Sequence, residues 1–370
     1  MKAFIVHDFF RGIDGGGKVI FTIAEAWGWP IITGEMDDIA KRGLFQRKSL
    51  QIIDLTIRQK APLVLSFSQI LQFWWGFSRL LSPHLKGAEL VLFSGQLALL
   101  GAKSVSRRQI LYCHTPPRIL YDARDFMLKN MPFSKRPFMR LLLAWYRYVY
   151  EKAIKQMHLV IANSENVRRR IKHYLGLDSV VVYPPVEIHK FRWIAQENFF
   201  LSTARLDSLK RVELIVRAFL KMPDKKLVVI SGGPLFEKLK RLASKASNIK
   251  IMGWVSEETL YELIGRCLAT IYIPKDEDFG ISPVESMAAG KPVIGVAEGG
   301  VLETIIPNET GILLPPDPSE DDLIKAVHSL TPARAKEMRP ACEARARFFD
   351  KEAFLAKMRE QFMKDADKHL

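Results

Sequence analysis

The sequence predicts an α/β protein made of two Rossmann-like domains, each with a parallel sheet. Apolar strand-like runs alternate with helical patterns along the chain, which is typical of βαβ units. The pattern is interrupted once, at Tyr183-Pro184-Pro185-Val186, and then begins again. Each proline fixes its own φ and restricts the residue before it, so this segment is predicted to be a stiff, extended break. With 370 residues the chain is long enough for two domains with separate cores.

The predicted elements define a boundary for each domain. The first half is expected to hold strands at residues 3–6, 90–93, 109–113, 159–162 and 180–183, and the second half at residues 199–202, 226–231, 249–252, 269–273 and 292–296. Residues 351–368 have the pattern of an amphipathic helix. We therefore expect an N-terminal domain over 1–183, a C-terminal domain over 184–350, and a last helix over 351–370.

The composition is that of a globular protein, with 48% hydrophobic and 26% charged residues. Cys113, Cys267 and Cys342 are widely spaced and form no disulfide or metal pattern, which suits a reducing compartment. The N-terminus begins with a strand-like run and does not resemble a signal peptide. These features favour a cytoplasmic location.

The positive charge is concentrated in the first half of the chain. Residues 1–183 contain 27 Lys and Arg against 13 Asp and Glu, whereas residues 184–370 contain 28 against 27. Such an asymmetry indicates an anionic partner for the first half: a membrane surface, a nucleic acid or a phosphorylated substrate.

Two segments of the first half bear on the choice among these partners. Residues 63–81 are apolar with a narrow polar stripe, but Pro62 just before them and the glutamines and serines within them argue against a spanning helix. Residues 138–155 interleave basic side chains with Trp and Tyr, which suits a helix lying on anionic lipid. Either segment alone fits an ordinary domain helix with one buried face. Together with the charge asymmetry, they favour peripheral attachment to the inner face of a cell membrane.

The most informative motif runs from Glu277 to Glu285. The chain leaves an expected strand through a loop at residues 276–280, and Pro283 suits the first turn of a following helix. Glu285 is expected in that first turn, with Glu277 in the loop facing it. A helix start attracts phosphate, and a carboxylate beside it can accept hydrogen bonds from sugar hydroxyls. The alternative is a pair of glutamates that only cap and solubilise a surface helix.

This segment, followed by Ala288-Ala289-Gly290-Lys291-Pro292-Val293, resembles the Glu-x7-Glu signature of the group 1 glycosyl transferases. These are retaining glycosyltransferases of family 4 with the GT-B fold. The resemblance implies that Glu277 contacts the transferred sugar and Glu285 the ribose of the donor nucleotide. It also implies that Phe279, Gly280 and Ile281 belong to the donor-binding segment. In the GT-B fold two Rossmann-like domains face each other across a cleft, and the last helix crosses back to the first domain.

A basic pair follows the first strand of the second half. Arg205 and Lys210 are expected between a strand end and the start of a helix at 212–220, where they can hold a pyrophosphate and stabilise its charge. Arg-x4-Lys is common and is usually only solvated. Here the pair resembles the diphosphate-binding pair of the family in spacing and location.

Two glycine segments complete the resemblance in the second half. Gly233 follows one expected strand, and Gly253, Trp254 and Val255 follow the next, where the backbone of the family meets the nucleotide base. Further along, residues 298–303 resemble the Gly-Gly-x-x-Glu turn of the family.

The first half adds two segments. Gly16 and Gly17 belong to a glycine triplet after the first strand, before a helix expected near Lys18, and this loop can approach a phosphate or sugar closely. Related sequences often carry an acidic residue where this chain has Lys18. His114 lies at the end of an apolar strand, in a stretch that resembles family members acting in lipopolysaccharide and exopolysaccharide assembly. The resemblance places His114 near the donor sugar.

The predicted activity is retaining transfer of a hexose from a nucleotide-sugar donor to a lipid-linked or glycan acceptor in cell-surface polysaccharide or glycolipid synthesis. Mannose from GDP-mannose is favoured, and a UDP-sugar is the alternative donor. The basic pair Arg205 and Lys210 can replace a metal ion, so no metal or other cofactor is expected. A sugar-nucleotide epimerase with the same fold is a second alternative. A basic nucleic-acid-binding protein is a distant one, since no nucleic-acid module signature is found.

Overall fold

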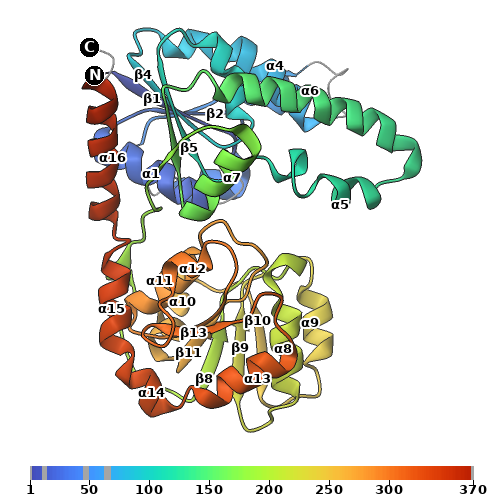
Figure 1. The fold of residues 1–370 in the computed structure, drawn as a ribbon, viewed down its shortest axis with the longest axis vertical. Helices are drawn as coiled ribbons and strands as arrows, with labels where there is room; N and C mark the ends of the chain where they lie inside the picture. The colour runs from blue at the N-terminus through green and yellow to red at the C-terminus, as the bar shows by residue number, and fades with distance from the viewer. Residues whose placement is uncertain (1, 11–14, 45–49, 62–67, 368–370) are drawn as a thin grey trace. The chain divides into compact units, whose positions relative to one another are not determined.

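The computed structural model describes residues 2–10, 15–44, 50–61 and 68–367. The chain divides into two compact units (Figure 1). Unit 1 consists of Met1–Tyr183 together with Leu355–Leu370, and unit 2 of Pro184–Phe354.

Unit 1 is built on a seven-stranded parallel sheet with the order β3-β2-β1-β4-β5-β6-β7. Its strands are β1 (Ala3–His7), β2 (Ile31–Thr33), β3 (Ile52–Asp54), β4 (Leu90–Ser94), β5 (Arg108–Cys113), β6 (Leu159–Ala162) and β7 (Val180–Val181). The central strands β1 and β4 are buried along their whole length, as expected when helices cover both faces of a parallel sheet. The strand order reverses between β1 and β4, so the carboxyl ends of these strands form a switch point.

Helices and short 3-10 turns connect the strands of unit 1. They are α1 (Gly15–Trp27), α2 (Asp38–Leu44), α3 (Ile57–Lys60), α4 (Gln69–Leu80), η2 (Ser82–Leu85), η3 (Ala98–Ser104), η4 (Arg118–Leu120), α5 (Arg124–Lys129), η5 (Phe133–Lys135), α6 (Arg136–Ile154) and α7 (Glu165–Leu175). Phe73 and Phe77 of α4 and Tyr146 and Tyr150 of α6 are buried in the main core cluster of this unit.

Unit 2 contains a six-stranded parallel sheet with the order β10-β9-β8-β11-β12-β13. Its strands are β8 (Phe199–Ser202), β9 (Lys226–Ile230), β10 (Ile249–Gly253), β11 (Ala269–Ile271), β12 (Val293–Val296) and β13 (Gly311–Leu314). The order reverses between β8 and β11, which again creates a switch point at the carboxyl edge of the sheet.

The connections of unit 2 are η6 (Ile188–Lys190), η7 (Ser208–Lys210), α8 (Val212–Leu220), α9 (Phe236–Leu242), α10 (Glu257–Arg266), α11 (Ile281–Ala288), α12 (Val301–Thr304), α13 (Glu320–Ser329), α14 (Pro332–Glu337) and α15 (Arg339–Arg347). Side-chain caps determine where several of these helices begin. Ser319, for example, begins α13 with a capping box, in which its hydroxyl accepts from Asp322 N and the Asp322 carboxylate accepts from Ser319 N.

The last helix, α16 (Lys351–Asp367), leaves unit 2 and packs on unit 1. The Phe362 ring lies 5.4 Å from that of Trp27 and 5.5 Å from that of Trp29, between ring centroids. Arg108, at the start of β5, donates from Nη2 to the Phe362 carbonyl at 2.8 Å. The predicted return of the final helix to the first domain is confirmed.

The sequence predicted two parallel-sheet domains, and this is confirmed. It missed three short strands, β2, β3 and β13. Of the apolar segment at 63–81, residues 62–67 lie outside the described residues. The described part is α4, whose Phe73 and Phe77 face the core. Among the described residues, no helix is both long and apolar enough to cross a membrane.

We predict that Phe362→Ala lowers the free energy of unfolding by about 3 kcal/mol, because a buried aromatic ring is lost from between two tryptophans. Urea unfolding measures the change. The neighbouring Met363 is exposed, and Met363→Ala serves as the matched control, with an expected change within about 0.5 kcal/mol. Equal effects of the two substitutions would contradict the docking of α16.

Candidate active site

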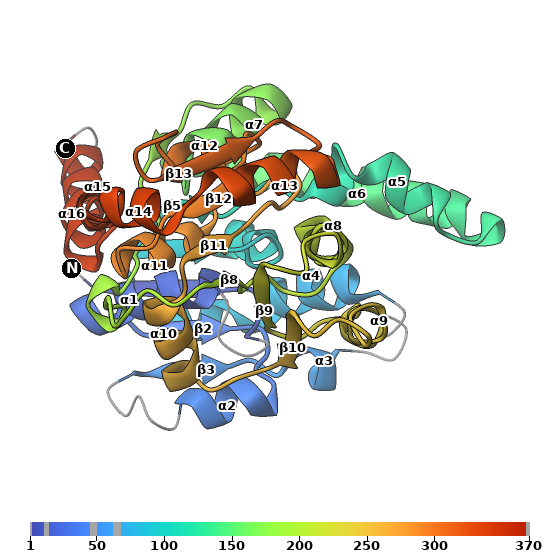
Figure 2. The same ribbon diagram turned by 90° about the horizontal axis from the view of Figure 1, so that it is seen from below.

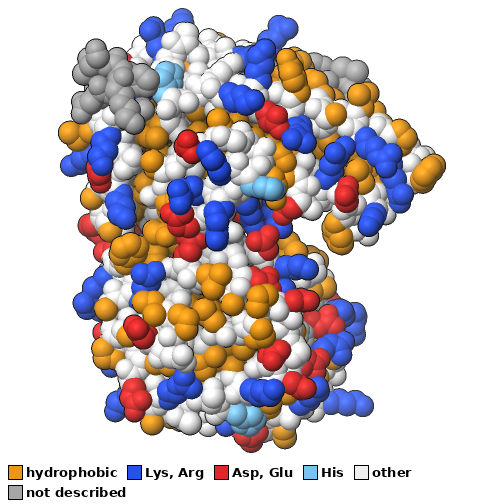
Figure 3. Space-filling model, viewed as in Figure 1, with side chains coloured by type: hydrophobic (Ala, Val, Ile, Leu, Met, Phe, Trp, Pro, Cys, Tyr) orange, Lys and Arg blue, Asp and Glu red, His pale blue; other side chains and the backbone are white. Residues whose placement is uncertain are grey.

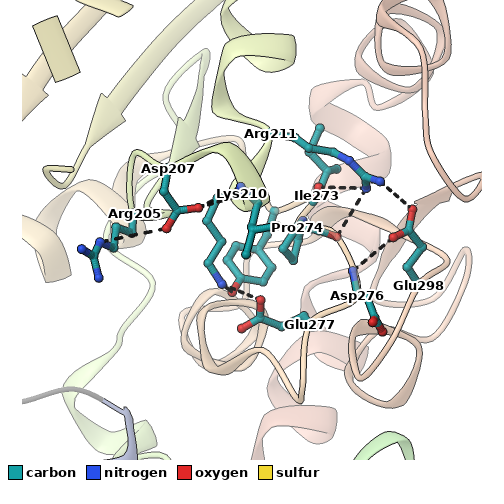
Figure 4. Close-up of polar contacts among 11 residues, drawn as sticks. Arg205, Asp207, Lys210, Arg211, Ile273, Pro274, Asp276, Glu277 and Glu298 are labelled. Carbon is teal, nitrogen blue, oxygen red and sulfur yellow. Dashed lines mark hydrogen bonds and ion pairs between the residues drawn. The ribbon is translucent and has the colours of Figure 1, made fainter. Parts of the chain in front are cut away.

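The candidate site of unit 2 lies at the carboxyl edge of its sheet. Arg205 follows β8, Glu277 follows β11 and Glu298 follows β12. Because the strands are parallel, these three segments emerge at the same edge, and β8 and β11 flank the switch point. Figure 4 shows the side chains that meet there.

The segment after β8 carries the basic residues. Asp207 caps the short η7 helix by accepting from Leu209 N at 3.0 Å and Lys210 N at 3.2 Å. Arg205 is exposed, and its Nε lies 4.0 Å from Asp207 Oδ2. Arg211 then adopts a left-handed conformation with φ of 51°, which turns the chain into α8. The cap and the turn together direct Lys210 and Arg211 to different neighbours.

Lys210 pairs with Glu277. Its Nζ lies 2.5 Å from Glu277 Oε2, and both side chains are about four-fifths buried (Figure 4). Nζ also donates to Tyr272 Oη at 3.4 Å. Burial, and after it the negative charge of Glu277, raises the pKa of Tyr272 well above its usual value, so its hydroxyl stays protonated. A lysine ammonium has three donors, so Lys210 can hold Glu277 and still offer an N–H to a phosphate oxygen.

Arg211 anchors the loop that carries Glu277. Its Nη2 donates to Glu298 Oε1 at 2.9 Å and to Asp317 Oδ1 at 3.1 Å. Its Nη1 approaches two carbonyl oxygens at the start of the loop, that of Ile273 at 3.5 Å and that of Pro274 at 3.4 Å. The planar guanidinium thus joins the end of β11 to the end of β12.

Glu298 holds the same loop from the other side. Its Oε2 accepts from Asp276 N at 3.1 Å and its Oε1 from Asp317 N at 2.6 Å. Burial alone would raise the pKa of Glu298. The hydrogen bonds from these two amides and from Arg211 outweigh burial and leave the pKa below the usual value. Glu298 is therefore ionised at neutral pH and fixes the backbone next to Glu277.

The turn after β12 requires its two glycines. A Cβ on Gly299 would lie 2.4 Å from the Glu277 carbonyl oxygen, and one on Gly300 would lie 2.4 Å from the Asp278 carbonyl oxygen. Gly300 N donates to the Glu277 carbonyl at 2.8 Å. The close approach of these backbones locks the loop in place.

Helix α11 begins at Ile281, after Gly280 with φ of 88°. Glu285 was predicted in the first turn, and this is wrong. It lies in the second turn because the helix begins two residues before Pro283. Glu285 is buried, and so is the Phe279 ring, which packs against Phe349 at 5.4 Å between ring centroids. Phe279 can therefore offer a ligand only its backbone.

The other predicted donor-binding residues lie at the ends of β9 and β10. A Cβ on Gly233 would lie 2.4 Å from the Leu206 carbonyl oxygen, so glycine is needed where this turn meets the segment after β8. The Trp254 indole lies against Gly232 and is 78% exposed. Gly253 has φ of 75°, and Val255 is half-buried. An exposed indole beside a glycine turn can stack on a planar base.

Unit 1 carries a separate polar cluster at the carboxyl ends of β1, β4 and β5. Ser94 Oγ lies 2.8 Å from His114 Nε2 and 3.2 Å from His7 Nδ1, so the hydroxyl links the two imidazoles. Asp8 accepts from the backbone N–H of Gln96 at 2.7 Å and of Leu97 at 2.8 Å, which fixes the loop after Ser94. His114 is thus held in one orientation with part of its surface accessible.

The glycine triplet is placed differently from the prediction. A loop before a helix near Lys18 was expected, and this is wrong, because Gly15, Gly16 and Gly17 form the first turn of α1. Their N–H groups lie at a helix N-terminus, which still suits an anion.

Arg118 and Asp122 form an ion pair with each other at 2.6 Å.

Sequence reasoning missed three functional candidates: Tyr272, Arg211 and Ser94. Tyr272 and Ser94 each lie at the end of an apolar strand, a position that could have identified them. Arg211 directly follows Lys210, but no local pattern shows that the two side chains point to different partners. Among the residues that the structure describes, no three His, Cys, Asp or Glu side chains come together as metal ligands.

The fold and the site define a glycosyltransferase of the GT-B class. The model of the glycosyl transferases group 1 matches residues 185–347, and that of glycosyltransferase family 4 matches residues 40–190. Both models describe glycosyltransferases, and together they match residues 40–347.

Curated relatives include the alpha-1,3/1,6-mannosyltransferases ALG2 of Mus musculus and Dictyostelium discoideum. The mouse protein is 25% identical over 57% of this chain and 57% of its own length. The Dictyostelium protein is 27% identical over 62% of this chain and 63% of its own length. The chain thus matches less than two thirds of the length of these relatives.

Solved structures share the fold over nearly the whole chain. The Anabaena protein Alr3699/HepE in complex with UDP and glucose has a TM-score of 0.78 and 18% identity, covering 98% of this chain and 99% of that one. The lipopolysaccharide outer core galactosyltransferase WaaB has a TM-score of 0.70 and 17% identity, with 100% of both chains covered. The predicted GT-B fold is confirmed.

We predict that Glu298→Gln reduces the free energy of unfolding by about 1–3 kcal/mol at pH 7, because charge-assisted hydrogen bonds are lost. The folded pKa of Glu298 lies below the ordinary value of 4.5. Its stabilising contribution is therefore present above pH 4.5 and is lost as the pH falls through the lowered pKa. Urea unfolding at several pH values should show that the free energies of unfolding of the wild type and the variant become equal in acid.

The exposed Glu309 provides the matched control, since Glu309→Gln removes a carboxylate that holds no loop. A difference between wild type and Glu298→Gln that stays constant as the pH falls would contradict the role given to Glu298.

Proposed function

We propose that this protein is a retaining glycosyltransferase that moves a hexose from a nucleotide-sugar donor to a hydroxyl acceptor. The observation that carries the proposal is the Lys210–Glu277 pair at the switch point of unit 2, with Arg205 on the same segment as Lys210. Two cations and a carboxylate at the carboxyl edge of a parallel sheet match the charges of a diphosphate joined to a sugar.

In this proposal the residues of unit 2 divide the donor among them. Arg205 and Lys210 hold the diphosphate, Glu277 accepts hydrogen bonds from the sugar hydroxyls, and Glu285 binds the ribose. Trp254 lies where the base would stack. The role proposed for His114, orienting the sugar, rests on the family resemblance alone.

The chemical step follows from this arrangement. The acceptor oxygen forms a bond to the anomeric carbon on the face from which the diphosphate leaves, so the configuration is retained. The bond between that carbon and the diphosphate oxygen breaks, and the leaving diphosphate takes the acceptor proton. Arg205 and Lys210 stabilise the charge that develops on the diphosphate, and the rest of the site positions the reactants.

Mannose from GDP-mannose is the proposed donor, supported by the similarity to proteins named as alpha-1,3/1,6-mannosyltransferases. A UDP-sugar is the second candidate, because the structurally similar Anabaena protein holds UDP and glucose. The proposed acceptor is a lipid-linked saccharide or another glycan in cell-surface polysaccharide or glycolipid synthesis, including lipopolysaccharide. The proposed location is the cytoplasmic side of an anionic membrane, with peripheral attachment supported by the basic first half of the chain.

The experiment that tests the proposal is a thermal-shift screen of GDP-, UDP- and ADP-sugars. A ligand that binds the folded state raises the midpoint in proportion to the logarithm of its concentration over Kd. We expect one nucleotide class to stabilise the protein at millimolar concentration. Hydrolysis and transfer products are then identified with and without acceptor, because an epimerase would convert the donor without one. No stabilisation by any nucleotide sugar would contradict the proposal.

We predict that Lys210→Ala and Glu277→Ala each reduce sugar transfer on the order of 10²-fold or more, because each removes a charged group that contacts the donor. Circular dichroism should show both variants folded. Lys245→Ala and Glu309→Ala remove exposed charges elsewhere in unit 2 and serve as matched controls with near-normal transfer. Near-normal turnover in either site variant would refute the assignment of the pair.

We also predict that transfer continues in the presence of EDTA, because the cationic pair takes the role that a metal ion plays in other transferases. The assay compares rates in EDTA, Mg²⁺ and Mn²⁺. Complete loss in EDTA with rescue by one particular metal would overturn this part of the proposal.

A further inference from the structure

The helices α5 and α6 form an arm that extends away from the sheet of unit 1. Figures 1 and 2 show α5 and the first turns of α6 projecting beyond the other elements of this unit in both views. The second half of α6 is anchored, since Leu143, Tyr146 and Tyr150 are buried in the core. We call residues 126–141 the arm tip.

The arm tip carries large apolar side chains, and apart from Leu128 most of them are not buried. From residue 129 to residue 141 no residue is buried. Phe133 is 81% exposed, Phe126 74% and Leu141 71%, and Phe138 is exposed as well. Large apolar side chains at this density on a projecting element are unfavourable in water and mark a surface that is covered in use.

The charge of the arm tip indicates what covers it. Between Asp125 and Glu151 the chain has five Lys and Arg residues and no Asp or Glu. Figure 3 shows basic and apolar side chains next to each other on the projecting part of unit 1. Aromatic rings interleaved with lysine and arginine match the boundary of an anionic bilayer, where the rings enter the acyl region and the cations meet the phosphates.

The arm tip is held in a defined shape by its own backbone contacts. Arg136 donates from Nε to the Met131 carbonyl at 3.0 Å and from Nη2 to the Lys129 carbonyl at 3.0 Å. Its guanidinium also lies over the Phe133 ring, 5.7 Å from the centroid. The turn between α5 and α6 is therefore pre-formed, so little ordering entropy is lost when it inserts.

A basic cavity of about 320 Å³ lies where the arm leaves the body of unit 1. Arg124, Arg147 and His173 line it, together with one acidic residue, Asp125, and the stacked rings of Tyr121 and Tyr174. Arg147 is paired with Glu151 at 2.6 Å. The buried Nε of Arg124 has no hydrogen-bond partner among the described residues, and burying a donor in this way is costly. The Arg124 and Arg147 guanidinium groups on the cavity wall can donate hydrogen bonds to a lipid phosphate.

We propose that the arm tip is the element by which this protein inserts into an anionic lipid bilayer, with the basic cavity at its base receiving a lipid headgroup phosphate. The inference deepens the proposed peripheral attachment and rests on that part of the proposed function. It assigns the attachment to Phe126, Phe133, Phe138 and Leu141 as inserting side chains and not to α4, whose Phe73 and Phe77 lie in the core.

The test is flotation of the full chain with vesicles of phosphatidylcholine alone and of phosphatidylcholine mixed with phosphatidylglycerol. We expect binding to the mixed vesicles only. The double variant Phe133→Ser with Phe138→Ser should lower the affinity roughly tenfold or more, because two inserting rings are lost. Ile39→Ser, which removes an exposed apolar side chain elsewhere in unit 1, should leave it unchanged.

Charge reversal tests the electrostatic half of the proposal. Lys135→Glu with Arg140→Glu should abolish the preference for anionic vesicles. Lys103→Glu with Arg107→Glu makes the same change in net charge at exposed positions outside the arm, and should weaken binding far less. Arg124→Ala should reduce binding to phosphatidylglycerol vesicles if the cavity receives the headgroup, and an unchanged affinity would remove the cavity from the proposal.

Insertion itself can be observed with a fluorophore. The three native cysteines are buried, so a cysteine introduced by Ser134→Cys can be labelled selectively with an environment-sensitive dye. A blue shift with anionic vesicles is expected for this label and none for a label at Ser106→Cys, an exposed site of unit 1.

Three outcomes would overturn the inference: no binding to anionic vesicles, arm variants that bind as wild type does, or a wild-type dimer that the arm variants convert to monomer. Thermal shift with nucleotide sugars is measured on the same variants. If the protein binds nucleotide sugars but not vesicles, the role proposed for the arm tip is wrong and the proposed glycosyl transfer still stands. If it binds vesicles but no nucleotide sugar, the proposed glycosyl transfer is wrong and the role of the arm tip still stands.

Discussion

The site of unit 2 depends on the ion pair between Arg211 and Glu298. This pair joins the segment after β8 to the ends of β11 and β12, and its two members hold the backbone at Ile273, Pro274 and Asp276. Because both groups are largely buried and each makes several hydrogen bonds, the loop between them has little freedom. Everything that the site does with Glu277 follows from this fixed loop.

The same constraint explains why two adjacent basic residues have different tasks. Arg211 adopts a left-handed conformation and turns inward to Glu298, whereas Lys210 is held by the Asp207 cap and reaches Glu277. One residue therefore supports the loop, and the other stays at the surface of the site, where a charged ligand can reach it. Glycines at 299 and 300 allow the turn after β12 to contact the loop backbone directly.

Much of the fold and of the candidate site could be predicted from the sequence, and there are physical reasons why the other parts could not. Apolar runs identified the central strands, and the resemblance of the motifs containing Arg205, Lys210, Glu277 and Glu285 to those of the family identified the segments that meet at the switch point. The first turn of α1 and the position of Glu285 were misplaced, because helix starts depend on the conformation of a single residue such as Gly280. The direction of the Arg211 side chain could not be predicted, since it depends on a contact with Glu298, which is 87 positions away in the chain.

The central claim is that Lys210 and Glu277, held by this loop, form a diphosphate-sugar site. Titration calorimetry of a nucleoside diphosphate and the corresponding monophosphate tests it most directly. We expect the wild type to bind the diphosphate more tightly than the monophosphate. In Lys210→Met the two affinities should become equal, since the second phosphate then has no ammonium group to bind it. Equal affinities for the two nucleotides in the wild type, or an unchanged advantage in Lys210→Met, would contradict it.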